Sequence, residues 1–247
     1  MSDILLSIII PVYNEERRLP NTLEEVFAFL STQPYRAEVI IVDNGSQDRT
    51  LEIAQEYAKT QALVRVLHIP RKGKGIAVKQ GMLAARGCYR FMCDADFSMP
   101  ASEIQRFLPP NLTDFDIAIA SREAPGARRF NEPHYRHFIG RVFNGLIRLI
   151  ALPGLHDTQC GFKCFRAEIA EDIFPLQTIP GWAFDVELLF VARKRGYRIV
   201  ELAVPWYFNP ESKIKVIRDA TRMALDLFKI RLNAWRGRYN HTNGKKI

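Results

Sequence analysis

Apolar runs alternate with segments of helical periodicity along this 247-residue chain. Five short runs rich in Ile, Val and Ala are typical of buried strands. They occupy residues 5–11, 38–42, 63–69, 89–93 and 116–121. The segments between the first four runs carry apolar residues at helical spacing, as at Leu19, Leu23 and Val26. Because strands and helices alternate, the pattern predicts an α/β fold with right-handed crossovers and a mostly parallel central sheet flanked by helices.

Acidic residues lie directly after three of the predicted strands. Glu15 is in the loop after the first strand, Asp43 follows the second, and the pair Asp94 and Asp96 follows the fourth. Since the carboxyl ends of parallel strands lie along one edge of a sheet, where open α/β sheets bind ligands, we expect these acids around one crevice. Each acid by itself is also compatible with an ordinary polar loop.

Asp94 and Asp96 are separated by one residue at the end of an apolar run. Two carboxylates in this position suit Mg²⁺ or Mn²⁺, because these ions take one or two protein carboxylates and complete their coordination with water and substrate phosphates. The pair therefore predicts a metal site that holds a diphosphate. A solvated turn after a strand is the alternative for this triplet.

Two segments of the second half show helical periodicity. Residues 135–152 carry apolar residues at helical spacing with arginines among them. Residues 213–238 carry an apolar stripe flanked by lysines and arginines, which predicts a C-terminal amphipathic helix. Such a helix either lies on an anionic membrane surface or packs on the domain, and the sequence leaves both alternatives open.

The charge balance narrows the choice of partners. The formal charge is +8, from 35 Lys and Arg against 27 Asp and Glu, which favours anionic partners such as nucleotide diphosphates or phospholipid surfaces. No nucleic-acid-binding motif is recognisable, so no nucleic acid partner is expected. The four cysteines lack zinc-site spacing and are expected to be reduced packing residues. Without a signal-peptide pattern or a long apolar segment, we expect a cytoplasmic protein peripherally associated with the inner face of the membrane.

Four segments at the predicted crevice together resemble the motif series of inverting family 2 glycosyltransferases with the GT-A fold. They are Pro11-Val12-Tyr13-Asn14-Glu15, residues 42–48, Gly73-Lys74-Gly75 and Asp94-Ala95-Asp96. The resemblance implies a nucleotide-sugar donor. It implies that the base contacts Pro11, Tyr13, Glu15 and Asp43, and that the ribose and the metal-bound diphosphate lie at Asp94, Ala95 and Asp96.

Lys74 is a candidate contact for the diphosphate. It stands between two glycines where a helix is predicted to begin, and a cation at a helix start suits an anion. A solvated lysine in a flexible loop is equally compatible with the sequence.

The second half resembles the polyprenyl-phosphate glycosyltransferases, and among them the dolichyl-phosphate β-glucosyltransferases. The resemblance rests on Asp-Thr-Gln-Cys-Gly-Phe-Lys at 157–163, on Trp-Ala-Phe-Asp-Val-Glu-Leu-Leu at 182–189 and on residues 210–214. The implied reaction is metal-dependent, inverting transfer of a hexose, with glucose from UDP-glucose favoured, to a polyprenyl phosphate. The expected domains are a catalytic domain over residues 1–210, with a nucleotide-sugar half (1–121) and an acceptor half (122–210), and a C-terminal helix and tail over 211–247.

A phosphate acceptor changes what the site requires. A phosphate monoester with a second pKa of about 6 is mostly ionised at neutral pH and can attack without a general base. The site instead needs cations, and Arg122 and Arg136 are the leading candidates because guanidinium groups match phosphate oxygens. Lys163, Ser212 and Lys213 lie in segments suited to the same task, and a surface salt bridge is the alternative for each. The predicted catalytic residues are Asp96, Arg122, Arg136 and Lys163.

Four further residues of the second half are candidates for contacts with the sugar or the acceptor. Asp157 and Gln159 are expected to orient the sugar or the metal shell. Asp185 and Glu187 are expected to bind sugar hydroxyls. Glu187 lies on an apolar helix, however, and is equally compatible with a buried partner for an arginine.

Three other functions are compatible with the sequence. GDP-mannose is an alternative donor, although Ser98 stands where related mannosyltransferases often carry a metal-binding glutamine. A saccharide acceptor is a second alternative, and it requires a general base. The third is a non-catalytic basic module that binds a membrane or nucleic acid through the C-terminal helix, for which steep salt dependence would be typical.

Overall fold

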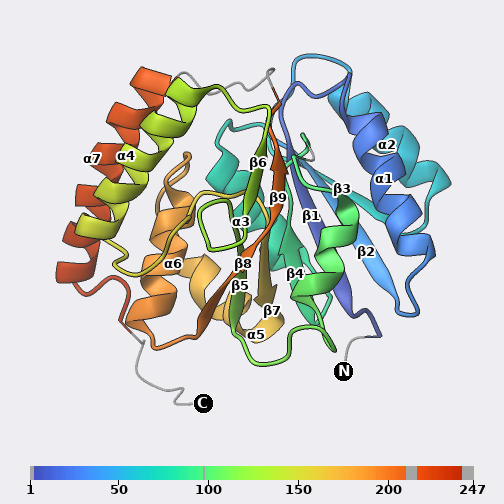
Figure 1. Cartoon of the computed structure of the whole chain (residues 1–247). Coiled ribbons are helices and arrows are strands. Elements are labelled where there is room, and N and C mark those ends of the chain that lie inside the picture. Colours follow the sequence, from blue (N-terminus) through green and yellow to red (C-terminus); the bar gives the residue numbers. More distant parts are fainter. Residues whose placement is uncertain (1–2, 97, 210–215, 241–247) are drawn as a thin grey trace.

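The computed structural model describes residues 3–96, 98–209 and 216–240, and it describes residues 216–220 by their backbone alone. The central sheet consists of β1 (Leu6–Val12), β2 (Ala37–Asp43), β3 (Val64–His68), β4 (Tyr89–Met92), β5 (Ile117–Ser121), β7 (Lys163–Arg166) and β8 (Ile199–Ala203). The strand order is β3-β2-β1-β4-β7-β5-β8 (Figure 1). Strand β7 is antiparallel to its neighbours β4 and β5, and the other neighbouring pairs are parallel. The expectation of a mostly parallel sheet is confirmed.

A small second sheet continues from the carboxyl ends of β5 and β8. Its strands are β6 (Arg128–Phe130) and β9 (Pro205–Tyr207), which pair in parallel. Strand β9 follows β8 after one residue, and β6 follows β5 after a short loop. This sheet therefore extends the carboxyl edge of the main sheet, where ligands of α/β proteins bind.

Helices cover both faces of the main sheet (Figure 1). The α-helices are α1 (Leu19–Ser31), α2 (Thr50–Thr60), α3 (Lys74–Ala84), α4 (His134–Ile150), α5 (Ala167–Ile173), α6 (Phe184–Lys194) and α7 (Val216–Trp235). Two 3-10 helices are η1 (Ala101–Phe107) and η2 (Phe174–Leu176). Helix α3 begins at Lys74, where the sequence predicts a helix start.

Strand β1 lies within the sheet and is buried on both faces. Ile8 pairs with Val39 of β2 and with Phe91 of β4. Successive side chains of a strand point to opposite faces, so Ile8 and Ile10 pack in the cluster that includes α1, whereas Ile9 packs in the cluster that includes α3. Each of the three isoleucines has 0% exposure, which explains why this strand is a continuous apolar run.

The cysteines carry no disulfide, as expected. Cys93, Cys160 and Cys164 are buried, which fits the expected packing role. Cys88 is exposed and does not have that role.

Helix α7 packs beside α4 on one flank of the molecule (Figure 1). Leu227 and Ile230 have 0% exposure, so one face of α7 packs on the domain. On the other face, Leu225, Phe228 and Trp235 are 66%, 62% and 85% exposed. None of the described helices is both long enough and apolar enough to span a bilayer.

Candidate active site

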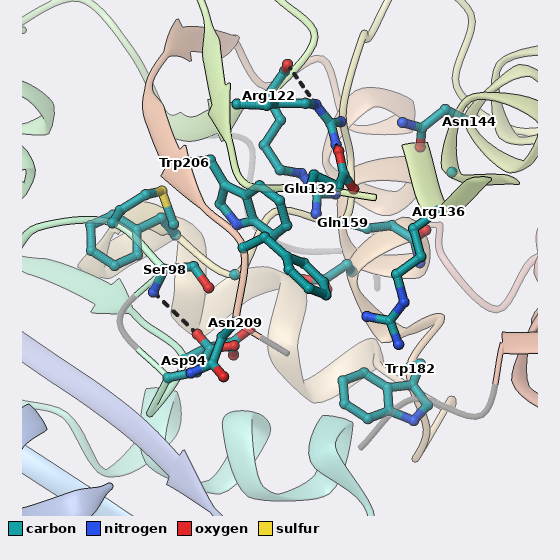
Figure 2. Close-up of a pocket in the computed structure, with 18 of the residues that line it drawn as sticks. Asp94, Ser98, Arg122, Glu132, Arg136, Asn144, Gln159, Trp182, Trp206 and Asn209 are labelled. Carbon is teal, nitrogen blue, oxygen red and sulfur yellow. Dashed lines mark hydrogen bonds and ion pairs between the residues drawn. The ribbon is translucent and has the colours of Figure 1, made fainter. Parts of the chain in front are cut away.

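Two cavities lie side by side at the carboxyl edge of the sheet. The first, of about 550 Å³, is lined by residues of the loops after β1, β2 and β4, and we call it the strand-end cavity. The second, of about 260 Å³, is lined by Arg122, Arg129 and Arg136 together with residues of α4 and β9, and we call it the arginine cavity (Figure 2). The wall common to both cavities consists of Lys74, Asp94, Asp96, Trp182 and Met223.

The strand-end cavity contains most of the residues expected at a nucleotide. Pro11, Tyr13 and Glu15 line it, as does Ala95. The Lys72 ammonium lies 3.8 Å from the centroid of the Tyr13 ring, which is a cation–π contact. The crevice predicted from the strand-end acids is therefore present in the structure.

Asp43 lies behind the wall of this cavity, not on it. Its carboxylate has 0% exposure, lies 2.8 Å from Nδ1 of His68 and accepts bonds from the backbone N–H groups of Gly45 and Ser46. The prediction that Asp43 contacts a base is wrong, because its buried oxygen atoms bind His68 and the backbone of the loop after β2. The neighbouring Asn44 lines the cavity instead, and its Oδ1 accepts the N–H of Gly73.

Lys74 begins α3 and points to the acidic pair. Its Nζ lies 2.6 Å from Oδ1 of Asp94, and Nζ also lies 4.9 Å from the centroid of the Trp182 ring. Burial acts to lower the pKa of Lys74, but the carboxylates of Asp94 and Asp185 outweigh it and raise the pKa. The ammonium is therefore charged at neutral pH, and the alternative of a solvated lysine is excluded.

Asp96 is half-buried, as is Asp94. Burial and then the charge of Asp94 raise the pKa of Asp96, and the ammonium of Lys74 acts in the opposite direction. The N–H of Ser98 donates to Oδ1 of Asp96 at 3.3 Å and orients this carboxylate. A further cation near the pair would stabilise its ionised form.

Gly161, in the loop before β7, lies directly against Asp94. A Cβ atom at this position would be 2.1 Å from Oδ2 of Asp94, which no side chain could adopt without displacing the carboxylate. Gly161 also lines the arginine cavity. The glycine thus lets the loop backbone approach Asp94 closely, since a side chain here would displace the carboxylate.

The donor set of this wall fits a divalent cation that is shared with a substrate. Among the described residues, no group of three or more His, Cys, Asp and Glu side chains could hold a metal ion. Asp94 and Asp96 would therefore be the protein ligands, and substrate phosphates and water would complete the coordination, as is usual for Mg²⁺ and Mn²⁺.

Arg122 follows β5 and is fixed by Asp157. Nε of Arg122 lies 2.6 Å from Oδ2 of Asp157, and Nη2 lies 3.0 Å from Oδ1. Burial acts to raise the pKa of Asp157, but the Arg122 guanidinium outweighs it and lowers the pKa to about 2. The prediction that Asp157 orients the sugar or the metal shell is wrong, because its carboxylate has 0% exposure and forms an ion pair with Arg122.

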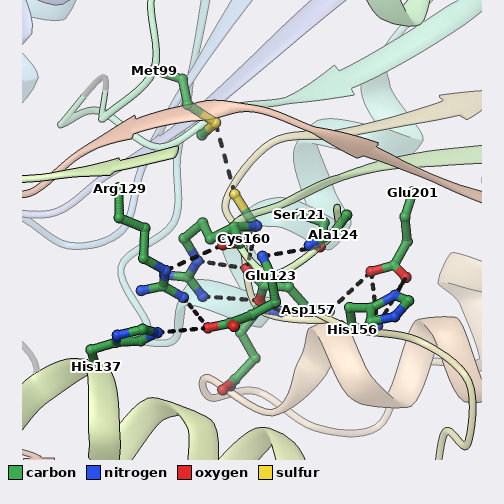
Figure 3. A network of polar contacts seen from close by, with 12 residues as sticks. Met99, Ser121, Glu123, Ala124, Arg129, His137, His156, Asp157, Cys160 and Glu201 are labelled. Atoms are coloured by element: carbon green, nitrogen blue, oxygen red, sulfur yellow. Dashed lines mark hydrogen bonds and ion pairs between the residues drawn. The ribbon is translucent and has the colours of Figure 1, made fainter. Parts of the chain in front are cut away.

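Aromatic rings orient the guanidinium groups of the arginine cavity. The Cζ atoms of Arg122 and Arg129 lie 5.4 and 5.6 Å from the centroid of the Trp206 ring. Arg129 is also bound at 2.6 Å by Glu123 (Figure 3). Glu132 binds it at the same distance. Such bracing holds Arg122 and Arg129 in place.

Arg136 differs from these two arginines in its partners. It reaches into the cavity from α4 (Figure 2), and its Cζ lies 5.2 Å from the centroid of the Phe208 ring. Within the described part of the chain, no carboxylate forms an ion pair with it. Arg136 is therefore a guanidinium of this cavity that is available for an anionic ligand.

Comparison with known proteins agrees with this geometry. Residues 7–174 match the model of glycosyl transferase family 2. The chain belongs to this family. It is 38% identical to the dolichyl-phosphate beta-glucosyltransferase of Drosophila melanogaster, over 94% of this chain and 77% of that protein. It is 34% identical to the human protein of the same name, again over 94% of this chain and 77% of the relative.

Solved structures of other glycosyltransferases share the fold. Glucosyl-3-phosphoglycerate synthase of Mycobacterium tuberculosis, in complex with Mn²⁺, UDP-glucose and phosphoglyceric acid, superposes with a TM-score of 0.69 over 98% of this chain and 82% of that chain, at 15% identity. Mannosyl-3-phosphoglycerate synthase of Rubrobacter xylanophilus gives 0.68 over 99% of this chain and 78% of that chain, at 17% identity. This family 2 glycosyltransferase therefore has the GT-A fold.

Lys163 of the glycosyltransferase is a buried residue and not a free cation of the site. It has 1% exposure, and its Nζ lies 2.9 Å from Oδ1 of Asp185 and donates to the carbonyl oxygen of Cys160. The prediction that Lys163 contacts the acceptor is wrong, because its buried ammonium binds Asp185 and the carbonyl oxygen of Cys160. Asp185 lines the arginine cavity, and its contact with sugar hydroxyls stays a prediction. Burial raises the pKa of Asp185, although Lys163 and Lys74 act in the opposite direction.

Glu187 has a structural role that neither interpretation of the sequence anticipated. It has 0% exposure and accepts bonds from the N–H groups of Thr178 and Ile179 and from the Tyr239 hydroxyl, the last at 2.7 Å. Burial and then the charge of Glu187 raise the pKa of Tyr239. The prediction that Glu187 binds sugar hydroxyls is wrong, because its buried carboxylate accepts these bonds. Glu187 instead joins α6 to the turn after α7.

Gln159 lines the arginine cavity, and its role at the sugar or the metal shell stays a prediction. Ser212 and Lys213 lie outside the described residues. Sequence reasoning did not select four residues that shape the two cavities, namely Arg129, Trp182, Trp206 and Phe208. Trp182 begins the motif at 182–189 that carries the family resemblance, so this motif is the sequence signal for its place in the site. The other three lie in short strands or loops whose local pattern gives no sign that they meet.

Proposed function

We propose that this glycosyltransferase transfers glucose from UDP-glucose to dolichyl phosphate or another polyprenyl phosphate and forms a β-linked product. The observation that carries the proposal is the common wall of the two cavities, which offers a diphosphate site at Asp94 and Asp96 on one side and guanidinium groups on the other. The names of the relatives support glucose and dolichyl phosphate. A neighbour that holds Mn²⁺ and UDP-glucose supports the donor and the metal.

The strand-end cavity would hold the donor. Pro11, Tyr13 and Glu15 would contact the base, and Lys72 would stabilise the position of the Tyr13 ring. Mg²⁺ or Mn²⁺ on Asp94 and Asp96 would offset the negative charge of the departing diphosphate. The sugar would then point across the common wall toward the arginine cavity.

The arginine cavity would hold the acceptor phosphate. Arg136 has no carboxylate partner among the described residues, and Arg122 is oriented by Asp157, so the two groups can clamp a phosphate. An ionised phosphate oxygen would form a bond to C1 from the face opposite the diphosphate while the bond from C1 to the diphosphate oxygen breaks. UDP leaves with the electron pair, the anomeric centre inverts, and no proton has to be removed from the acceptor.

A saccharide acceptor is the second candidate, and Asp185 favours it. A hydroxyl nucleophile needs a base, and Asp185 is a carboxylate with a raised pKa at the arginine cavity. Its contact with Lys163 and the abundance of guanidinium groups fit a phosphate acceptor better. For the donor, GDP-mannose is the corresponding alternative to UDP-glucose.

One pair of assays tests the proposal. Thermal unfolding with UDP- and GDP-sugars, with and without Mn²⁺, should show stabilisation by UDP-glucose with Mn²⁺, since a ligand of the folded state stabilises it. Transfer should then occur to polyprenyl phosphate and not to free sugars. Asp96→Ala should abolish metal-dependent transfer, whereas Asp114→Ala, an exposed acid remote from both cavities, should retain it. Full transfer by Asp96→Ala would contradict the assignment.

We further propose that the enzyme is cytoplasmic and lies on the inner face of an anionic membrane through α4 and α7. The C-terminal helix was expected to provide this contact, and α4 adds Tyr135, Phe138, Val142 and Leu149 at 60% to 83% exposure. Exposed basic residues lie among these apolar side chains, at Arg141, Lys229 and Arg231. An apolar face with basic flanks suits the interface of an anionic bilayer, where a polyprenyl phosphate resides.

A further inference from the structure

The carboxylate of Asp94 is held from two sides. Lys74 Nζ lies 2.6 Å from Oδ1, and the backbone of Gly161 lies against Oδ2. The loop before β7 therefore packs against the Asp94 oxygen atom that is not bound by Lys74. A cation that approaches Asp94 from the cavity meets an oxygen atom that the ammonium already occupies.

Lys74 stands in a row of alternating charges that crosses the common wall. Lys163 Nζ is 2.9 Å from Asp185, and the charges of both Asp94 and Asp185 act on Lys74. The row therefore runs from Lys163 to Asp185, Lys74 and Asp94. Each charge has a neighbour of opposite sign, so the carboxylate of Asp94 is already partly neutralised by the protein.

A divalent cation bound to Asp94 and a lysine ammonium on the same carboxylate repel each other. In the free protein the cation must displace Lys74 or bind beside a like charge, and either outcome lowers its affinity. A nucleotide diphosphate changes this balance, because its oxygen atoms give the ammonium a new partner next to the metal. The Trp182 ring, 4.9 Å from Nζ, lines the same wall and offers the moving ammonium a second favourable surface.

We propose that Lys74 is an exchangeable counter-ion, which occupies Asp94 until a divalent cation and a nucleotide diphosphate bind together and then moves to the diphosphate. This role rests on the metal-dependent donor site proposed above and adds the order of binding. Metal alone binds weakly, and nucleotide and metal each strengthen the binding of the other by the same factor. Lys74 is thereby a positioning residue that ties metal loading to the presence of donor.

The test is a titration of the full chain with Mn²⁺ in the absence of nucleotide. The paramagnetic resonance signal of free Mn²⁺ measures how much of the ion remains unbound. Lys74→Met should bind Mn²⁺ at least about tenfold more tightly than the wild type, because the competing ammonium is absent. Lys74→Arg keeps the charge and should stay close to the wild type. Added UDP should raise the Mn²⁺ affinity of the wild type by a larger factor than it raises the Mn²⁺ affinity of Lys74→Met. Both affinities are corrected for the Mn²⁺–UDP complex that forms in solution.

Lys72→Met is the matched control. Lys72 also lines the strand-end cavity, but its ammonium lies over Tyr13 and not on Asp94. Its removal should leave Mn²⁺ affinity without nucleotide unchanged. Lys74→Gln provides a second uncharged variant, and thermal unfolding confirms that each variant is folded.

Equal Mn²⁺ affinities of the wild type and the uncharged Lys74 variants would overturn the proposal, as would an equal gain in Lys72→Met. Sugar transfer plays no part in these measurements. A protein that shows the exchange but transfers no glucose to polyprenyl phosphate would overturn the proposed function and leave the role of Lys74 intact. A glucosyltransferase whose Lys74 variants bind Mn²⁺ like the wild type would overturn that role alone.

Discussion

Arg122 and Asp157 form a bidentate ion pair beneath the arginine cavity, with Nε 2.6 Å from Oδ2 and Nη2 3.0 Å from Oδ1. The backbone N–H of Arg122 also donates to Oδ2 of Asp157, at 3.0 Å. The pair thus holds both the side chain and the backbone of the loop that follows β5. Because the Asp157 carboxylate has 0% exposure, its charge depends on this partner.

Asp157→Asn should destabilise the protein and change its response to acid. The pKa of Asp157 is lowered from 3.8 to about 2, so its ionisation contributes about 2 kcal/mol to the free energy of unfolding at neutral pH. This contribution is complete above about pH 4 and is lost as the pH falls toward 2. Removal of one partner leaves a buried charge, so the total loss should be about 3–5 kcal/mol.

Urea unfolding at pH 7 and at steps down to pH 2 measures both effects. The variant should be less stable than the wild type at pH 7 and should lose less stability on acidification. Asp114→Asn is the control, since its pair with Arg198 is largely exposed and should contribute less than about 1 kcal/mol. Equal stability of Asp157→Asn and the wild type at pH 7 would show that the pair contributes nothing.

Gly161→Ala should impair the donor site without unfolding the protein. The added methyl group would lie 2.1 Å from Oδ2 of Asp94, so the carboxylate must move. Misplacement of a reacting group by about 1 Å can reduce turnover about 100-fold, and a loss of this order is expected in kcat/KM for the donor. Gly145→Ala is the control, because a Cβ there meets no atom within 4 Å and Gly145 lines neither cavity. Unchanged transfer by Gly161→Ala would mean that Asp94 is not needed in its present position.

Arg136→Ala should weaken the acceptor and spare the donor. A charge-assisted hydrogen bond contributes about 1.5–3 kcal/mol, so KM for polyprenyl phosphate should rise about tenfold or more while KM for UDP-glucose stays the same. Arg128→Ala removes an exposed arginine of β6 that does not line the cavity and should change neither constant. A selective rise in the donor KM would place Arg136 on the donor side instead.

Phe138→Glu and Leu149→Glu should reduce binding to anionic vesicles. Phe138 and Leu149 are 70% and 83% exposed on α4, and a carboxylate at either position is repelled by anionic lipid and disfavours insertion of its face. Flotation with vesicles of phosphatidylcholine and phosphatidylglycerol measures the bound fraction. Leu83→Glu, at an exposed apolar residue of α3, is the control. Equal flotation of all three variants would exclude α4 from the contact.

Much of the first half follows from local sequence. The predicted strands at 5–11 and 38–42 correspond to β1 and β2 within two residues at each end. A strand buried on both faces must be apolar throughout, so its position is visible in a short window of sequence. Asp94 and Asp96 are equally visible because they follow such a strand directly, and the parallel order of the sheet then brings them to the edge that also carries Glu15.

Tertiary structure decided which of the charged residues are free to act. Asp157, Lys163 and Glu187 have the residue types of a binding site, yet each is buried on a partner from another segment. Glu187 and Tyr239 are 52 positions apart, and no local pattern indicates that they meet. Sequence by itself thus determined β1 to β5 of the seven-stranded sheet, the acidic pair and the family resemblance, since these depend on short apolar runs and motifs. The fold decided that Lys74 meets Asp94 and that Arg136 lacks a carboxylate partner among the described residues, because ion pairing in a site depends on which distant segments pack together.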